Sequence, residues 1–154
     1  EAPDRSPLLD APSLYSIGLA HKHLPEMQKL AGLDSAPVFV PILGDIRQGM
    51  MTSVMLQNRL LNGSPTAQDI CEMLSSYYEG QEMVRVLPFG GETPRLATSA
   101  LAGKDYLTIT VSGHTDQTLL TAQFDNLGKG ASGAAVQNMN IMLGFPESTG
   151  LNID

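Results

Sequence analysis

The sequence has 154 residues, of which 42% are apolar and 16% are charged, so it can bury the core of one ordinary domain and is not typical of a disordered chain. Its formal net charge of -7 argues against binding to nucleic acid or to an anionic membrane surface. No apolar run reaches membrane-spanning length, and the single cysteine excludes an intrachain disulfide and favours a reducing, cytoplasmic location.

The first third of the chain predicts short elements separated by proline and glycine. Residues 1–13 carry three prolines and lack an initiator Met, so we expect a linker at an excised boundary, with the domain at residues 14–154. The stretch after this linker starts extended. Pro25 suits the first turn of a short helix that ends before Gly32. The apolar run at 37–43 then predicts a buried strand.

The rest of the chain alternates strands, loops and helices. We expect a turn-rich loop at 44–50, a strand at 50–57, a helix at 66–79 capped by Ser64 or Thr66, a strand at 82–88, a long loop at 89–104 with a short strand near 96–100, strands at 105–114 and 118–126, and a helix at 131–143. In the last two predicted strands apolar and polar residues alternate, and a short polar turn separates them, which predicts an antiparallel hairpin. These elements predict an α+β fold with a mostly antiparallel or mixed sheet and helices on one face.

Gly128, Gly130 and Gly133 have the spacing of a dinucleotide-binding turn, and they precede a predicted helix. A dinucleotide unit also needs a parallel strand after the helix, with an acidic residue at its end. Here the preceding strand belongs to a hairpin and no strand follows. Two interpretations stay open: the glycines permit close packing, or their N–H groups and Lys129 face a ligand held partly by another domain.

The sequence His-Lys-His-Leu-Pro-Glu places His21, His23 and Glu26 close together. In an extended segment both imidazoles point to the same side, and Glu26 in the first helical turn can approach His23. A carboxylate beside an imidazole fixes its orientation, as acid–base catalysis requires. The alternatives are ordinary surface histidines, a metal pair completed by Glu26 or His114, or a glutamate that merely favours the helix N-terminus.

The residue types that complete a catalytic set are less evident. Cys71 lies on the apolar stripe of the helix at 66–79, so we expect an inert core thiol and not a nucleophile. Arg47 lies in a glycine-flanked loop, where its guanidinium could bind a carboxylate or phosphate or simply be solvated. We predict no metal site.

Three segments resemble the second half of the N-acetyl-gamma-glutamyl-phosphate reductase family. They are LAHKHLPEM, FVPILGDIRQGMM and DNLGKGASGAAVQNMNIMLGFPESTGL, whose order and spacing agree with that family across residues 14–151. The loop departs from the pattern, because the family often has Arg-Gly where this chain has Arg47, Gln48 and Gly49. The resemblance implies a C-terminal domain like that of glyceraldehyde-3-phosphate dehydrogenase, which catalyses and dimerises.

In that family, a first domain binds NADP and carries the nucleophilic cysteine, so the resemblance implies that this chain alone is inactive. It implies that His23 or His21, assisted by Glu26, is the acid–base group. Arg47 and Lys129 would bind the N-acetyl-glutamyl phosphate substrate. The residues implied near the nicotinamide are Asn126, Gly128 and Gly130.

The implied partners are the chain's own NADP-binding domain and further copies in a dimer or tetramer. Three other functions stay open. The first is a structural dimerisation module, and the second is a related acyl-phosphate or semialdehyde dehydrogenase of the lysine-pathway or aspartate-semialdehyde type. The third is a stand-alone anion- or metal-binding module.

Overall fold

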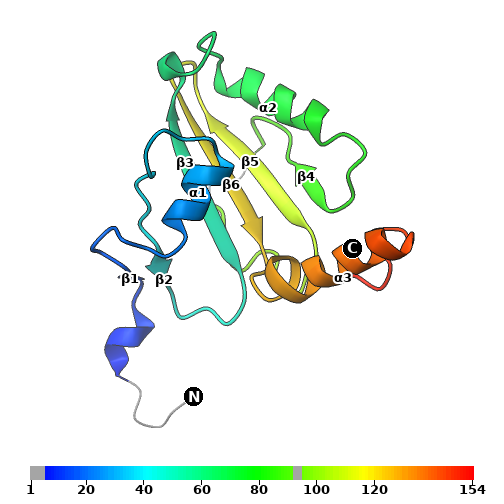
Figure 1. The fold of residues 1–154 in the computed structure, drawn as a ribbon. Coiled ribbons are helices and arrows are strands. Elements are labelled where there is room, and N and C mark those ends of the chain that lie inside the picture. The colour runs from blue at the N-terminus through cyan, green and yellow to red at the C-terminus, as the bar shows by residue number, and fades with distance from the viewer. Residues whose placement is uncertain (1–5, 92–94) are drawn as a thin grey trace. The chain divides into compact units, whose positions relative to one another are not determined.

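The computed structural model describes residues 6–91 and 95–154, and the chain divides into two compact units, Glu1–Arg47 and Gln48–Asp154 (Figure 1). We call these unit 1 and unit 2. Parts of the predicted linker at 1–13 and of the predicted loop at 89–104 lie outside the described residues. None of the helices in the described ranges combines the length and the apolar character needed to span a membrane.

Unit 1 has little regular structure. It contains a 3-10 turn at Pro7–Asp10, the antiparallel strands β1 (Ser13–Leu14) and β2 (Ile42–Leu43), and helix α1 (Leu24–Leu30). Helix α1 has Pro25 in its first turn, and the chain leaves it at Gly32, whose φ is 63°, so this predicted helix is confirmed.

The buried strand predicted at 37–43 is wrong in extent and in burial. Only Ile42 and Leu43 pair with another strand, and the Val38 side chain is 83% exposed. Leu24 is the one buried residue among the described residues of unit 1. The apolar run therefore lacks a core of its own unit to pack against, and burial is what stabilises a strand of this composition.

Unit 2 is built on a four-stranded sheet with the order β3-β6-β5-β4. Its strands are β3 (Met50–Gln57), β4 (Val84–Val86), β5 (Leu107–Gly113) and β6 (Gln117–Phe124). Strand β6 pairs antiparallel with both β3 and β5, whereas β4 runs parallel to β5. The predicted hairpin and the α+β class with a mixed sheet are thus confirmed.

Helix α2 (Ala67–Tyr77) covers one face of this sheet, where it lies along β4 and β5 (Figure 1). Ile70 and Cys71 of the helix form the core with Val111 of β5. Thr66 caps the helix: its hydroxyl accepts the N–H of Asp69, and the Asp69 carboxylate accepts the N–H of Thr66. Hydrogen bonds from the Thr66 side chain and backbone lower the pKa of Asp69.

The short strand predicted near 96–100 is wrong, because these residues lead into turns that run to residue 103. Side-chain contacts hold the segment in place of a strand ladder. The Gln123 side chain donates a hydrogen bond to the carbonyl of Ala97 at 2.8 Å, and Leu101 is buried.

The last helical elements of unit 2 are a π-helical turn at Gly128–Ser132 and helix α3 (Gly133–Leu143), which stops at Gly144 with a φ of 75°. The predicted helix at 131–143 is confirmed to within two residues. Its buried residues are Gly133 and Asn140, and the Met142 side chain is 85% exposed. The apolar side chains of α3 therefore contribute little to the core of unit 2.

Candidate functional site

Unit 1 brings His23 and Glu26 together. His23 directly precedes α1, and Glu26 lies in the first turn of that helix. Because the two residues are three positions apart, the Nδ1 atom of His23 lies 3.3 Å from a carboxylate oxygen of Glu26, with the side chains 50% and 65% exposed. The predicted approach of the carboxylate to this imidazole is confirmed, whereas its catalytic role stays a prediction.

His21 has a different environment. Its ring meets the rings of Tyr15 and Phe39 edge-on, with centroids 5.7 and 5.1 Å away, and it lies 5.0 Å from the His23 ring. Its Nδ1 atom accepts the backbone N–H of His23 at 3.2 Å. Through this contact the His21 ring holds the backbone of His23.

The two histidines therefore differ in chemistry as well as in position. A carboxylate at Nδ1 of His23 favours the tautomer in which Nε2 can accept a proton, and it stabilises the imidazolium that forms. The contacts of His21 within the described residues are the Tyr15, His23 and Phe39 rings and the backbone N–H of His23, and none of them is a carboxylate. The arrangement therefore suits His23 better than His21 for proton transfer.

Arg47 is the last residue of unit 1, and its side chain is exposed. Across residues 6–91 and 95–154, no carboxylate forms an ion pair with its guanidinium. The group therefore keeps its donors for solvent or for an anionic ligand. Gln48, the next residue, begins unit 2 and contacts the glycine-rich segment described below.

The three glycines of the predicted turn lie in a close-packed corner of unit 2. A Cβ atom at Gly128 would lie 2.7 Å from the carbonyl oxygen of Lys104, and one at Gly130 would lie 3.1 Å from the Phe124 ring. At Gly133 it would overlap the carboxylate of Asp105. Any side chain at these positions requires neighbouring atoms to move, so close packing explains the glycine spacing without a ligand.

A buried carboxylate lies at the centre of this corner, at a position that the motifs in the sequence did not indicate. Asp125 directly follows β6 and is 0% exposed. Its two oxygens accept the backbone N–H groups of Gly103 and Leu127 and the side-chain amide of Gln48. Its carbonyl accepts the N–H of Gly130 at 2.8 Å. Position was the available signal, because an aspartate between a strand and a glycine-rich turn is suited to bind the N–H groups of that turn.

The hydrogen bonds to Asp125 also decide its charge. Burial by itself would raise the pKa of Asp125. Backbone hydrogen bonds from Gly103, Leu127 and Gly128, and one from the Gln48 side chain, outweigh burial and lower the pKa. Asp125 is therefore an ionised carboxylate at neutral pH. It occupies N–H groups that a phosphate would need, so the turn does not have the free cradle of a dinucleotide site.

Asn126 and Lys129 are also held by contacts within unit 2. The side-chain oxygen of Asn126 accepts the N–H of Gly49 at 2.9 Å. The ammonium group of Lys129 donates to Gln137, which donates in turn to Glu147. Desolvation lowers the pKa of Lys129, and the charges of Glu147 and Asp105 oppose this shift. The role of Lys129 in substrate binding stays a prediction.

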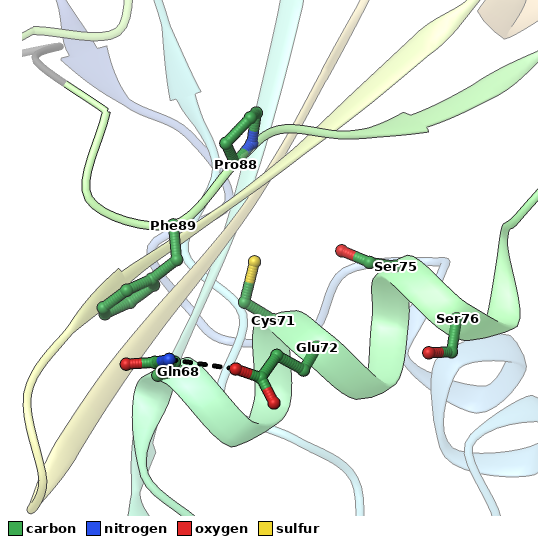
Figure 2. Close-up of a pocket in the computed structure, with 7 residues that line it drawn as sticks. All are labelled: Gln68, Cys71, Glu72, Ser75, Ser76, Pro88 and Phe89. Atoms are coloured by element: carbon green, nitrogen blue, oxygen red, sulfur yellow. Dashed lines mark hydrogen bonds between the residues drawn. The ribbon is translucent and has the colours of Figure 1, made fainter.

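The described surface also has an open pocket of about 580 Å³ between α2 and the segment after β4 (Figure 2). It is lined by Gln68, Cys71, Glu72, Ser75, Ser76, Pro88 and Phe89. The Cys71 thiol is buried and donates to the carbonyl of Leu87 at 3.5 Å, as expected of a core thiol. None of the predicted site residues lines this pocket. Within the described ranges, no three His, Cys, Asp or Glu residues are grouped to hold a metal ion.

Comparisons with known proteins show which proteins this chain resembles. The family model described as "Semialdehyde dehydrogenase, dimerisation domain" matches residues 4–126. The chain is 41% identical to N-acetyl-gamma-glutamyl-phosphate reductase 2 of Nostoc sp. over 90% of its length and 45% of that protein. It is 45% identical to N-acetyl-gamma-glutamyl-phosphate reductase 2 of Pseudomonas putida, over 89% of this chain and 45% of the relative.

The third comparison is with N-acetyl-gamma-glutamyl-phosphate reductase of Brucella ovis, to which the chain is 47% identical over 85% of its length and 44% of the relative. The chain thus spans less than half the length of the curated relatives that it matches.

Proposed function

Because this chain belongs to the family of semialdehyde dehydrogenase dimerisation domains, we propose that it is the catalytic and dimerisation domain of an N-acetyl-gamma-glutamyl-phosphate reductase. The observation that carries this proposal is the 41% to 47% identity to reductases of that name over 85% to 90% of the chain. The reaction would reduce an acyl phosphate to N-acetylglutamate semialdehyde, with release of phosphate, in the cytoplasmic synthesis of arginine.

His23 would be the group that moves protons in this reaction, and Glu26 would orient it. A cysteine on the part of the protein outside this chain would attack the acyl phosphate and form a thioester. His23 would accept the thiol proton as the sulfur displaces phosphate, and it would donate this proton to the oxygen of the thiohemiacetal that hydride transfer forms. It would take the proton back as the C–S bond breaks and releases the aldehyde and the cysteine thiolate. The contact of 3.3 Å between His23 and Glu26 supports this division of roles. His21, whose Nδ1 accepts a backbone N–H, would hold the backbone of His23.

NADPH would supply the hydride for this reduction. The glycine turn suits contact with a flat ring better than contact with phosphates, because Asp125 already accepts N–H groups of the turn. Asn126 is the donor that fits. Its oxygen is bound to Gly49, and its side-chain N–H groups have no partner in the described parts of the chain. Asn126 would therefore donate to the nicotinamide carboxamide, with Gly128 and Gly130 beside it.

Arg47 would bind an anionic group of N-acetyl-glutamyl phosphate, since its exposed guanidinium can form paired hydrogen bonds with a carboxylate or phosphate. Lys129 would contribute a second positive charge to substrate binding. The partners would be the nucleotide-binding domain of the same polypeptide and a second copy of this chain. Exposed apolar side chains in both units, such as Val38 at 83% and Met142 at 85%, favour such partners.

The test is to express this chain joined to the nucleotide-binding half of a relative and to follow phosphate-dependent reduction of NADP+ by N-acetylglutamate semialdehyde. We expect activity from the joined protein and none from the chain alone. His23→Ala should lower kcat by about 10²- to 10⁴-fold, the usual contribution of an acid–base residue. His114→Ala is the matched control, because His114 also lies near a carboxylate, 3.9 Å from Asp116, on the hairpin of unit 2.

Full activity of His23→Ala would exclude the assigned acid–base role. Activity with aspartate semialdehyde or with a carrier-bound lysine-pathway substrate, and none with N-acetylglutamate semialdehyde, would favour a related dehydrogenase instead. If the joined protein associates into dimers but oxidises none of these substrates, the chain is a structural dimerisation module.

A further inference from the structure

Three segments of unit 2 meet at the Asp125 carboxylate. They are the Gln48–Gly49 pair before β3, the turn that ends at Gly103, and the start of the glycine turn at Leu127. Gln48 donates its side-chain amide at 3.0 Å, and Leu127 donates its N–H at 2.8 Å. Gly103 donates its N–H to the same oxygen as Gln48. These segments are far apart in sequence, so the carboxylate is a junction between them.

The charge of Asp125 makes this junction rigid. The carboxylate forms no ion pair within the described ranges, so N–H dipoles alone compensate a buried negative charge. A buried charge is tolerated only when its hydrogen-bond donors are held in place. Movement of any of the three segments would leave the charge less well solvated, and the segments therefore keep one mutual arrangement.

A second set of contacts extends the junction to Asn126 and Gly49. Asn126 accepts the N–H of Gly49, which is the neighbour of Gln48. Gly49 has a φ of 122°, and a Cβ atom there would overlap the carbonyl of Thr98 and lie 2.8 Å from the Cα of Ser99. The loop before β3 thus packs directly on the turn that also supplies the N–H of Gly103.

We propose that Asp125 is a positioning residue, whose buried carboxylate holds Asn126 and the Gln48–Gly49 backbone as one rigid unit. The inference rests on the proposed function, in which Asn126 meets the cofactor and Arg47, covalently joined to Gln48, meets the substrate. Asp125 is fully buried, so it acts on both contacts through its neighbours and touches neither ligand.

The first measurement is amide hydrogen exchange in the joined protein, for wild type and Asp125→Asn. The Gly49 N–H donates to Asn126 and not to Asp125. Its protection from exchange therefore reports whether the Asp125 carboxylate also holds a hydrogen bond in which it takes no part. We expect exchange of the Gly49 N–H to accelerate in Asp125→Asn by about tenfold or more beyond any acceleration of the β5 amides, which report global unfolding. Asp116→Asn, on the exposed turn of the same hairpin, should leave the Gly49 amide as in wild type.

The second measurement is steady-state kinetics of the same variants. Misplacement of Asn126 should lower kcat/KM for the cofactor in Asp125→Asn by about 10- to 100-fold. Gln48→Leu removes one donor and keeps the side-chain volume, so it should accelerate Gly49 exchange and lower kcat/KM to a smaller extent. This variant carries the test if Asp125→Asn does not fold.

Unchanged protection of Gly49 in the folded variants would overturn the positioning role, and so would an unchanged kcat/KM. An inactive wild-type protein would overturn the proposed function and with it the role of Asp125 in the reductase. The exchange data would then still report whether the carboxylate holds the three segments together.

Discussion

The histidine pair of unit 1 and the Asp125 junction of unit 2 are built in opposite ways. In unit 1, half-exposed side chains meet along a few residues of sequence, and His23 contacts Glu26 only three positions away. In unit 2, the fully buried Asp125 carboxylate accepts hydrogen bonds from N–H groups as far away in sequence as Gln48, 77 residues before it. Local sequence fixes the first arrangement, whereas the tertiary fold fixes the second.

The difference in exposure matches two different proposed roles, proton transfer for His23 and structural support for Asp125. Proton transfer needs an imidazole that solvent or substrate can reach, so exposure of His23 agrees with its proposed role. A residue that holds neighbouring segments in place must be one whose displacement raises the free energy of the folded protein. A buried ionised carboxylate is such a residue, because displacement would remove its hydrogen bonds. Substitutions in unit 1 should therefore change activity with little effect on stability, and substitutions around Asp125 should change stability.

Gly49→Ala tests this contrast with the largest expected effect. The substitution places a side chain at a φ of 122°, against the backbone of Thr98 and Ser99, which cannot rotate away. We expect the free energy of unfolding to fall by about 3 kcal/mol or more, from backbone strain and overpacking together. Urea denaturation of the intact protein measures it. Gly18→Ala in unit 1 is the control, because no atom lies within 4 Å of a Cβ there, and equal losses would contradict the contrast.

The acid dependence of stability tests the charge of Asp125. Because its pKa is lowered in the folded state, ionised Asp125 stabilises the protein above the unfolded-state pKa of about 4, and this contribution is lost as pH falls further. We expect Asp125→Asn to be less stable at pH 7 by about 2 kcal/mol, the scale of hydrogen bonds to a charged group. The difference should shrink below pH 4. Asp69 titrates in both proteins, so its contribution cancels, and a constant difference would exclude an ionised Asp125.

Glu26→Gln tests whether the unit 1 contact affects activity alone. Glutamine keeps the size of the side chain and can still accept a hydrogen bond from His23, but it does not stabilise the imidazolium by charge. We expect kcat to fall about tenfold, less than in His23→Ala, with the unfolding midpoint unchanged. An unchanged kcat would show that the negative charge of Glu26 does not assist His23, and a large loss of stability would place Glu26 with the supporting residues.

The sequence predicted what depends on local pattern. Helical spacing identified α2, alternation identified the hairpin of β5 and β6, and the spacing of His23 and Glu26 predicted their contact. The sequence-based prediction was wrong where burial determines whether a strand forms. The run at 37–43 has the composition of a buried strand, but exposed residues in this chain cannot gain the packing energy that stabilises one.

Asp125 escaped detection because its importance depends on long-range contacts. Glycine spacing drew attention to the residues after it, and one of the two open interpretations directed their N–H groups to an external ligand. The structure shows these groups bound to the neighbouring aspartate instead. Nothing in a short motif distinguishes an internal carboxylate from a bound phosphate, since both satisfy the same donors.

Thr66→Ala tests the same contrast between the two units with the smallest expected effect, the loss of a helix cap. Thr66 and Asp69 form a reciprocal capping box on α2, whereas His23 precedes α1 without a capping hydrogen bond from its side chain. Removal of the Thr66 hydroxyl leaves the N–H of Asp69 without its partner, so the free energy of unfolding should fall by about 1 kcal/mol. His23→Ala should change it by less than about 0.5 kcal/mol, the usual limit for an exposed position. Parallel urea titrations measure both, and a loss in His23→Ala as large as that in Thr66→Ala would mean that His23 supports the fold of unit 1 as well as its chemistry.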